Sequence, residues 1–338
     1  MKAVGIIGMG DPDVVQVIDA ADPSCGPSEV MIRPEATSYN HLDALLRQKD
    51  FGLDFPVVPG SDVVGHVISG SSELVGRRVL VNPAIPCGKC DRCKSGNQCR
   101  YVQILGVHRS GGYGEFVIVP AGQCLEAPDS LSSEELGSFP LVFLTAWRML
   151  KSRARLSMGE HVLIWGASGG LGSAAVAIAK ALSARAIAIV RNSRHVAILE
   201  NYGADVVIDA STVNVSAAVK SLTGGEGVDV VFEGPGADTW PTSMAVVSQG
   251  GRIVTAGVTS GSSVQVDLQD LYYRQISILG SRIGHQTEFI EVFGQLLAGH
   301  LRPLISEVIP LSHAAEAHRR AARGDRCGKI VLRHDFYR

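Results

Sequence analysis

The pattern of hydrophobic and polar positions along the chain changes near residue 130. Before that point, short apolar runs alternate with clusters of glycine, proline and aspartate. This alternation predicts the short strands and tight turns of a small, irregular β-barrel. The strands that we expect cover residues 29–33, 62–68, 78–81 and 114–119.

From Ser132 onward the pattern is first helical and then alternates between strands and helices. A helical run extends from Glu134 to Leu150, and strands rich in apolar, β-branched residues follow. Strands of this kind suit a sheet that helices cover on both faces, so we expect a doubly wound parallel sheet and an α/β fold. The expected strands cover residues 161–165, 186–190, 205–208, 228–232, 252–258 and 276–279. Mixed character returns from about Gly284, with a closing strand at residues 329–332.

Composition and charge narrow the class of protein. The 338 residues are 46% hydrophobic and 19% charged, which suffices for a full core and favours two domains. Lys and Arg number 31 against 33 Asp and Glu, with no long run of either sign, which disfavours a nucleic-acid partner. We see no export signal, and Lys180 and Arg185 interrupt the longest apolar stretch. We therefore expect a cytoplasmic protein with no membrane partner.

A glycine-rich turn follows the strand expected at residues 161–165 and leads into an alanine-rich helix. Its glycines permit a tight turn and a close approach to a pyrophosphate, while the helix N-terminus offers free N–H groups. A turn without a ligand is the alternative, but the strand before it and the helix after it favour dinucleotide binding. The residues that we expect to contact the coenzyme are Gly166, Ala167, Ser168, Gly169, Gly170, Leu171 and Gly172.

The residues after the second strand of this sheet indicate which coenzyme is bound. An NAD site normally places an acidic residue there, where it accepts hydrogen bonds from the ribose hydroxyls. This chain has Arg191, Ser193 and Arg194 instead, which can hold a 2′-phosphate through charge-assisted hydrogen bonds. The sequence therefore predicts NADPH in preference to NADH. The alternative is that both arginines are solvated and contact no phosphate.

Four cysteines crowd into a short segment of the N-terminal half. Because disulfides are rare in cytosolic proteins, this spacing favours a metal site over a disulfide framework. Four thiolates close the coordination sphere of one tetrahedral Zn²⁺, so we expect a structural zinc without chemistry of its own. Partial occupancy or oxidation of the thiols is the alternative. The predicted ligands are Cys87, Cys90, Cys93 and Cys99.

The order of these pieces resembles the medium-chain dehydrogenase/reductase superfamily over essentially the whole chain. The resemblance rests on the cysteine lobe, the glycine loop and four further segments, residues 38–43, 59–65, 111–115 and 328–332. It implies a GroES-like catalytic domain at residues 1–125 and 284–338, with a zinc lobe at residues 87–99, and a Rossmann domain at residues 126–283. It also implies a homodimer, with a tetramer as the alternative, because members often pair through the last Rossmann strand.

The same resemblance implies that the catalytic zinc of the alcohol dehydrogenases is missing. The ligand positions of that zinc match Asn40, Ser61–Asp62 and Leu141, which are poor ligands or none. Without a metal, the charge that develops on a simple carbonyl oxygen lacks an electrophile, whereas a conjugated acceptor spreads that charge over an enolate. Zinc-free members that reduce quinones, enones or enoyl thioesters share the Asn-x-x-Asp pattern seen here. We therefore expect NADPH-dependent reduction of an activated carbon–carbon double bond.

Individual roles follow from the residue types and from the resemblance. Asn40 is a candidate donor to the substrate carbonyl or to the nicotinamide, with a satisfied turn residue as the alternative, and Asp43 is a candidate orienting residue. Tyr39 is the nearest candidate proton donor, with a core or pocket-wall tyrosine as the alternative. The coenzyme contacts implied by the resemblance are His41 and Lys329 at the phosphates and Thr145 and Gly257 near the nicotinamide.

Two alternatives remain open at this point. One is an alcohol or aldehyde dehydrogenase whose metal is held by an unusual set of ligands, His41, Asp43 and Asp62. The other is a protein that binds NADPH without turnover.

Overall fold

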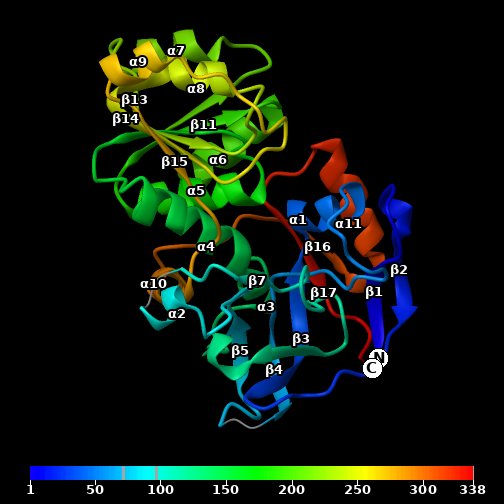
Figure 1. Ribbon diagram of the computed structural model, residues 1–338. Coiled ribbons are helices and arrows are strands. Elements are labelled where there is room, and N and C mark those ends of the chain that lie inside the picture. The colour runs from blue at the N-terminus through cyan, green and yellow to red at the C-terminus, as the bar shows by residue number, and fades with distance from the viewer. Residues whose placement is uncertain (71–72, 96–97, 338) are drawn as a thin grey trace. The chain divides into compact units, whose positions relative to one another are not determined.

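The computed structural model describes residues 1–70, 73–95 and 98–337, and the chain forms two compact units (Figure 1). Unit 1 contains Met1–Leu141, Gly284–Glu291 and Ile305–Arg338, and unit 2 contains Val142–Ile283 and Val292–Leu304.

The units differ from the expected domain boundaries at two places. Residues 126–141, which we expected in the Rossmann domain, belong to unit 1, and residues 292–304 belong to unit 2. The first difference has a packing reason: α3 (Ser133–Gly137) lies against β3 (Glu29–Ser38), and a side chain at Gly137 would approach the Ala36 Cβ to 2.9 Å. Glycine thus lets this short helix pack closely on the sheet of unit 1.

Unit 1 is built around a seven-stranded sheet in the order β16-β17-β3-β4-β5-β9, with β8 pairing with β3 outside this path. All of its pairings are antiparallel except the one between β16 and β17. The expected strands are present, and Val30 and Ile32 on β3 face a core of apolar residues. The other bounds in this sheet are β4 (Val64–Gly70), β5 (Arg78–Val81), β8 (Val117–Pro120), β9 (Cys124–Glu126), β16 (Ile305–Pro310) and β17 (Lys329–Arg333).

Two small sheets and several helices complete unit 1. A second apolar core joins the first strand to residues of α1 and α11. The small sheets are β1 (Lys2–Ile6) with β2 (Val15–Asp19), and β6 (Ala84–Ile85) with β7 (Gln103–Ile104). The helices are α1 (His41–Gln48), α2 (Asp91–Lys94) and α11 (Ala314–Arg323).

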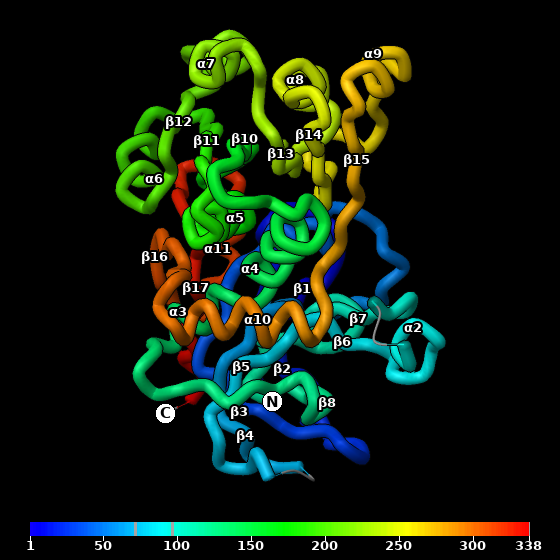
Figure 2. The backbone as a smooth tube through the Cα atoms, turned by 90° about the vertical axis from the view of Figure 1, so that its left-hand side faces the viewer, coloured from blue at the N-terminus to red at the C-terminus, as the bar shows by residue number. Residues whose placement is uncertain are grey.

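Unit 2 contains the six-stranded parallel sheet expected from the sequence. Its order is β12-β11-β10-β13-β14-β15, which Figure 2 shows from one edge to the other. Helices α5 and α6 cover one face and α7 and α8 the opposite face (Figure 1), as in a doubly wound fold. The strands are β10 (His161–Ile164), β11 (Arg185–Val190), β12 (Val206–Asp209), β13 (Val228–Glu233), β14 (Val247–Thr255) and β15 (Ser277–Gly280). The helices are α5 (Gly170–Ala181), α6 (Val196–Tyr202), α7 (Val215–Leu222), α8 (Trp240–Val246) and α9 (Leu268–Tyr273).

The expected single helical run from Glu134 to Leu150 is interrupted. It forms α3, then α4 (Pro140–Trp147), then a π-helical segment at Arg148–Arg153. Pro140 lacks a backbone N–H and fits the first turn of α4, so it separates the two helices.

The segment after Gly284 is more regular than we expected. It includes the twelve-residue α10 (Gln286–Leu297), β16 and α11. Over the part of the chain that the structure describes, no helix combines the length and the apolar character of a membrane span.

Candidate active site

The glycine loop connects β10 to α5 with the geometry that the sequence predicts. Gly166 adopts a positive φ of 64°, and a side chain at Gly172 would lie 2.3 Å from the Gly166 carbonyl oxygen. The conformation of Gly166 therefore favours glycine, and the close contact at Gly172 requires it. The first turn of α5 leaves backbone N–H groups without intrahelical acceptors, and these are the donors that an anionic group requires.

The arginines after β11 lie at the carboxyl end of the strand next to β10. Arg191, Ser193 and Arg194 are exposed, and the Asn192 side chain accepts a hydrogen bond of 3.1 Å from the Arg194 backbone N–H. Within the described residues neither arginine forms an ion pair with a carboxylate, so both remain available to an anionic ligand.

A buried cluster of polar side chains in unit 1 contains several predicted site residues. The Asp62 carboxylate is fully buried and accepts hydrogen bonds from Ser38 Oγ at 2.6 Å, Asn40 Nδ2 at 2.8 Å and the Leu141 backbone N–H at 2.7 Å. Lys329 Nζ lies 3.2 Å from the same carboxylate. The cluster therefore joins the three positions that the resemblance matched to zinc ligands.

Lys329 uses all three of its ammonium hydrogens inside this cluster. Its Nζ donates to the Tyr39 carbonyl oxygen at 3.0 Å, to Asn40 Oδ1 at 2.5 Å and to Asp62 Oδ2. The side chain is only 2% exposed. The expectation that Lys329 contacts a coenzyme phosphate therefore does not fit this geometry, because an ammonium group has three donors and no more.

Asn40 is also held inside the cluster. Its Oδ1 accepts from Lys329, and its Nδ2 donates to Asp62 and, at 3.4 Å, to the Ser38 carbonyl oxygen. Both amide hydrogens thus point to protein acceptors, at 2.8 Å and 3.4 Å, and the predicted role of Asn40 as a donor to the substrate would require the longer of these bonds to open.

Asp43 forms the second buried carboxyl of the cluster. It accepts a 2.7 Å hydrogen bond from the Asn40 backbone N–H, which completes a capping box at the start of α1, and the Tyr113 hydroxyl lies 3.4 Å away. Burial raises the pKa of Asp43 from 3.8 to about 7, against the lowering effect of the Asn40 N–H and of the Lys329 charge. The carboxyl therefore titrates near neutral pH in the folded chain.

Replacing Asp43 with asparagine should flatten the dependence of unfolding free energy on pH. The raised pKa means that the folded chain keeps its proton while the unfolded chain releases one, so stability falls as pH rises from about 4 to about 7. One such group contributes at most about 1.4 kcal/mol per pH unit. Denaturant unfolding of Asp43→Asn and wild type between these limits measures the difference, with the exposed Asp54→Asn as control. Parallel profiles for the wild type and Asp43→Asn would contradict the assignment.

Tyr39 and His41 lie on either side of Asn40 in different surroundings. Tyr39 is buried in the core of unit 1, where its ring packs edge-on against His318 and burial raises its pKa to about 12. This packing agrees with the alternative of a core tyrosine, and the role of proton donor stays a prediction. His41 is the exposed first residue of α1, and partial burial of its ring, followed by the Arg326 and Lys49 charges, lowers its pKa.

The four cysteines of the predicted lobe come together. Their sulfur atoms all lie within 4.8 Å of one another, with Sγ–Sγ distances of 3.5 Å for Cys90–Cys93 and 3.9 Å for Cys87–Cys93. A tetrahedron with Zn–S bonds of about 2.3 Å has edges of about 3.8 Å, so this donor set fits Zn²⁺. In the described parts of the chain it is the sole group of three or more His, Cys, Asp or Glu arranged for a metal; residues 96–97 of the lobe lie outside them.

The remaining predicted residues lie in unit 2. Thr145 is half-buried on α4. Gly257 follows β14, where a side chain would approach the Gly234 carbonyl oxygen to 2.5 Å. Glycine at this position therefore allows two loops at the carboxyl ends of β13 and β14 to lie in contact.

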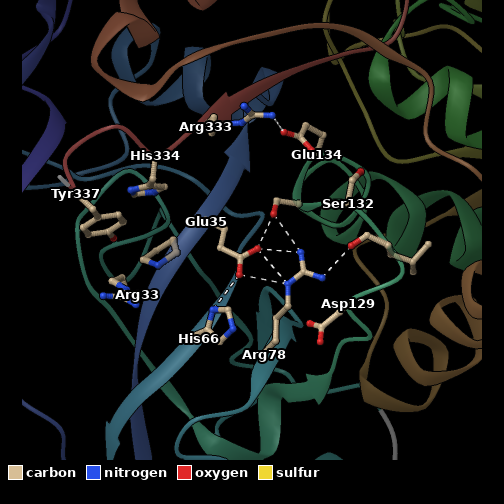
Figure 3. A pocket seen from close by; sticks show the side chains of 13 residues that line it. Arg33, Glu35, His66, Arg78, Asp129, Ser132, Glu134, Arg333, His334 and Tyr337 are labelled. Carbon is tan, nitrogen blue, oxygen red and sulfur yellow. Dashed lines mark hydrogen bonds and ion pairs between the residues drawn. The ribbon is translucent and has the colours of Figure 1, made fainter.

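A pocket of about 800 Å³ opens on unit 1, and none of the predicted site residues lines it (Figure 3). Its central carboxylate, Glu35, accepts from Arg78 at 2.9 Å and from Ser133 Oγ at 2.5 Å, and it lies 2.9 Å from His66 Nδ1. Burial alone would raise the pKa of Glu35, but the hydrogen bonds from Arg78 and Ser133 keep it below its usual value. The Glu35 carboxylate is thus held by Arg78 and Ser133, and we assign it a structural role. We therefore assign no chemistry to this pocket.

The comparisons with known proteins agree with the fold. The family model "Zinc-binding dehydrogenase" matches residues 170–298, and "Alcohol dehydrogenase GroES-like domain" matches residues 26–129. The chain is 30% identical to an NAD-dependent alcohol dehydrogenase of Saccharolobus solfataricus, over 94% of this chain and 95% of that protein. It is 29% identical to a crotonyl-CoA reductase of Streptomyces avermitilis, over 94% and 81%. A crystal structure of an NAD-dependent alcohol dehydrogenase superposes with a TM-score of 0.93 at 35% identity, covering 98% and 99%.

Proposed function

Since the chain belongs to the medium-chain dehydrogenase/reductase superfamily, among the zinc-type alcohol dehydrogenase-like proteins, we propose that it is an NADPH-dependent reductase of activated carbon–carbon double bonds. The substrate class is an enone, a quinone or an enoyl thioester. The relative named crotonyl-CoA reductase supports this class, because a crotonyl group carries a double bond conjugated to its carbonyl.

The observation that carries the proposal is the buried Lys329 ammonium group. It donates to Asn40 and Asp62, which are two of the positions matched to the ligands of the catalytic zinc. At the third position Leu141 offers only its backbone N–H, which Asp62 accepts. A fixed positive charge at these side chains opposes the binding of a metal cation there, so the donor set does not fit a catalytic zinc.

This arrangement determines which acceptors are suitable. Without a metal electrophile, a simple ketone has no strong partner for its developing negative charge. When bound, NADPH would supply a hydride to the β-carbon of a conjugated acceptor, whose carbonyl oxygen would carry the resulting negative charge until solvent supplies a proton to the α-carbon. The Lys329–Asn40–Asp62 cluster contributes by holding the start of α1 in one conformation.

An alcohol dehydrogenase is the second candidate, and the names of two similar proteins favour it. It requires a metal set outside the cysteine lobe. His41, Asp43 and Asp62 are not arranged as such a set, and Asp43 and Asp62 are engaged by hydrogen bonds within the chain.

We assign coenzyme binding to both units and zinc to the lobe. In unit 2 the proposed contacts are Gly166, Ala167, Ser168, Gly169, Gly170, Leu171, Gly172, Arg191, Ser193, Arg194, Thr145 and Gly257, and in unit 1 His41. The cysteine lobe holds one structural Zn²⁺. We further propose a homodimer through β15, the edge strand of the parallel sheet, whose Ile278 is 38% exposed.

Turnover and metal content, measured on the same sample, test this proposal. With NADPH and a panel of enones, quinones and enoyl thioesters, we expect coenzyme oxidation and a product whose double bond, not its carbonyl, is reduced. Metal analysis should give about one zinc per chain. A second zinc, or oxidation of simple alcohols that a mild chelator abolishes without unfolding the protein, would favour the alcohol dehydrogenase. No turnover with any acceptor would favour an NADPH-binding protein without activity.

A further inference from the structure

Glu233, the last residue of β13, carries a carboxylate that is fully buried within unit 2. Its Oε1 accepts from the Gly236 backbone N–H at 2.9 Å and from Thr239 Oγ1 at 2.7 Å, and its Oε2 accepts from Ser243 Oγ at 2.5 Å. No lysine, arginine or histidine of the described residues forms an ion pair with it. Because a buried carboxylate without hydrogen bonds costs free energy, these three bonds hold their donors in place.

Ser243 connects this carboxylate to the glycine loop after β10. Its Oγ accepts a hydrogen bond of 2.8 Å from Trp165 Nε1, and the Trp165 backbone N–H donates to the Phe232 carbonyl oxygen at 3.1 Å. Trp165 directly precedes Gly166, the first residue of the glycine loop. One serine hydroxyl and one indole N–H therefore join Glu233 to the start of that loop.

The loop after Glu233 is bonded in turn to the loop after β14. The Ser260 backbone N–H donates to the Pro235 carbonyl oxygen at 2.8 Å, and Gly236 forms a β-bridge with Gly261. By holding Gly236, the Glu233 carboxylate therefore also restrains this second loop.

The three loops lie at the carboxyl ends of β10, β13 and β14. The strand order reverses between β10 and β13, and in doubly wound folds a ligand binds outside the carboxyl ends of the strands at such a point. In the proposed function the adenosine half of the coenzyme lies at Arg191 and Arg194 after β11, and the diphosphate lies at the start of α5. The nicotinamide half then reaches the ends of β13 and β14.

We propose that Glu233 is a positioning residue for the nicotinamide half of the coenzyme. It acts through Gly236, Thr239 and Ser243 and holds the three loops in the conformation that binds, while its own buried oxygens contact protein donors. Loops that are ordered before binding lose less conformational entropy when the ligand arrives. This inference rests on the proposed function, since it presumes a dinucleotide coenzyme.

Glu233→Gln tests the inference because it keeps the size of the side chain and replaces one acceptor oxygen with a donor. In either orientation its NH₂ group faces a present donor, the Gly236 N–H or the Ser243 hydroxyl. By calorimetry, NADPH should bind about 5- to 20-fold more weakly, within the range for one lost hydrogen bond. Binding of 2′,5′-ADP, which has the adenosine half and no nicotinamide, should change by less than about twofold. The fluorescence of NADPH at saturation should also be lower than in the wild type, because the nicotinamide ring is held less rigidly.

Asp229→Asn is the matched control. Asp229 lies near the amino end of the same strand and also accepts from a backbone N–H, that of His161 at 2.8 Å. Its replacement should leave both affinities within about twofold of the wild type. If Glu233→Gln does not fold, Thr239→Val removes one donor to the carboxylate, and NADPH but not 2′,5′-ADP should bind about threefold more weakly.

Three results would overturn the inference. They are an unchanged NADPH affinity in Glu233→Gln, an equal loss for 2′,5′-ADP, and an equal NADPH loss in Asp229→Asn. If the wild type prefers NADH, NADH and 5′-AMP replace the two probes. That preference, or an absence of turnover, contradicts the proposed function alone, because the comparison requires only that a coenzyme binds. A wild type that binds neither coenzyme contradicts both.

Discussion

Replacing Lys329 with methionine is expected to destabilise the protein by about 3 to 5 kcal/mol, the usual cost of removing one partner from a buried ion pair. The Asp62 carboxylate would keep its hydrogen bonds from Ser38, Asn40 and Leu141, but it would lose its only ion-pair partner in the described chain. Methionine fills a similar volume, so the charge and not a cavity dominates the effect. Thermal unfolding followed by circular dichroism should show a Tm lower by roughly 10 °C.

A double-mutant cycle separates this charge effect from general disruption. Adding Asp62→Leu to Lys329→Met removes the unpaired carboxylate, so the double variant should be more stable than the sum of the single variants predicts. The exposed Lys49→Met should change stability by less than about 0.5 kcal/mol. If Lys329→Met unfolds at the wild-type temperature, the ammonium group is not the counterion of Asp62, and the main support for a zinc-free site is lost.

The parallel sheet could be predicted because each of its strands is marked by residues that are neighbours in the sequence. Each strand of unit 2 is a short apolar run between polar turns, and the glycines of the loop reveal a close approach of the backbone at Gly172. The helical run after Ser132 was harder, because its helical pattern continues through Pro140. The unit to which α3 belongs depends on its packing against β3, a contact between residues about a hundred positions apart that periodicity does not encode.

The sequence predicted which residues form the candidate site, but it did not predict how they contact one another. The sequence pointed to Asn40, Asp43, Asp62 and Lys329, and the structure joins them in one cluster. It did not indicate that Lys329 turns inward, because a lysine at the start of a strand usually remains exposed. The one available signal was its place directly before the apolar residues 330–332 of β17.

Replacing Arg191 and Arg194 together with alanine should weaken NADPH by about 2 to 4 kcal/mol if each makes a charge-assisted contact with the 2′-phosphate. This corresponds to a loss of roughly 30- to 1000-fold in affinity. NADH lacks that phosphate, so its affinity should change little. Both side chains are exposed at the end of β11, where no acidic residue of the Arg191–Arg194 segment competes with them.

Both coenzymes must be measured, because two similar proteins are named NAD-dependent alcohol dehydrogenases. The two dissociation constants then show whether this chain prefers NADPH or NADH. Fluorescence titration of both coenzymes gives the two dissociation constants for the wild type and the double variant. Arg185→Ala is the matched control, since Arg185 is equally exposed but lies at the opposite end of β11. An equal loss for NADPH and NADH would show that the arginines act on something common to both coenzymes. If the wild type binds NADH more tightly than NADPH, the NADPH assignment is wrong. The proposed substrate class, an activated carbon–carbon double bond, would still stand.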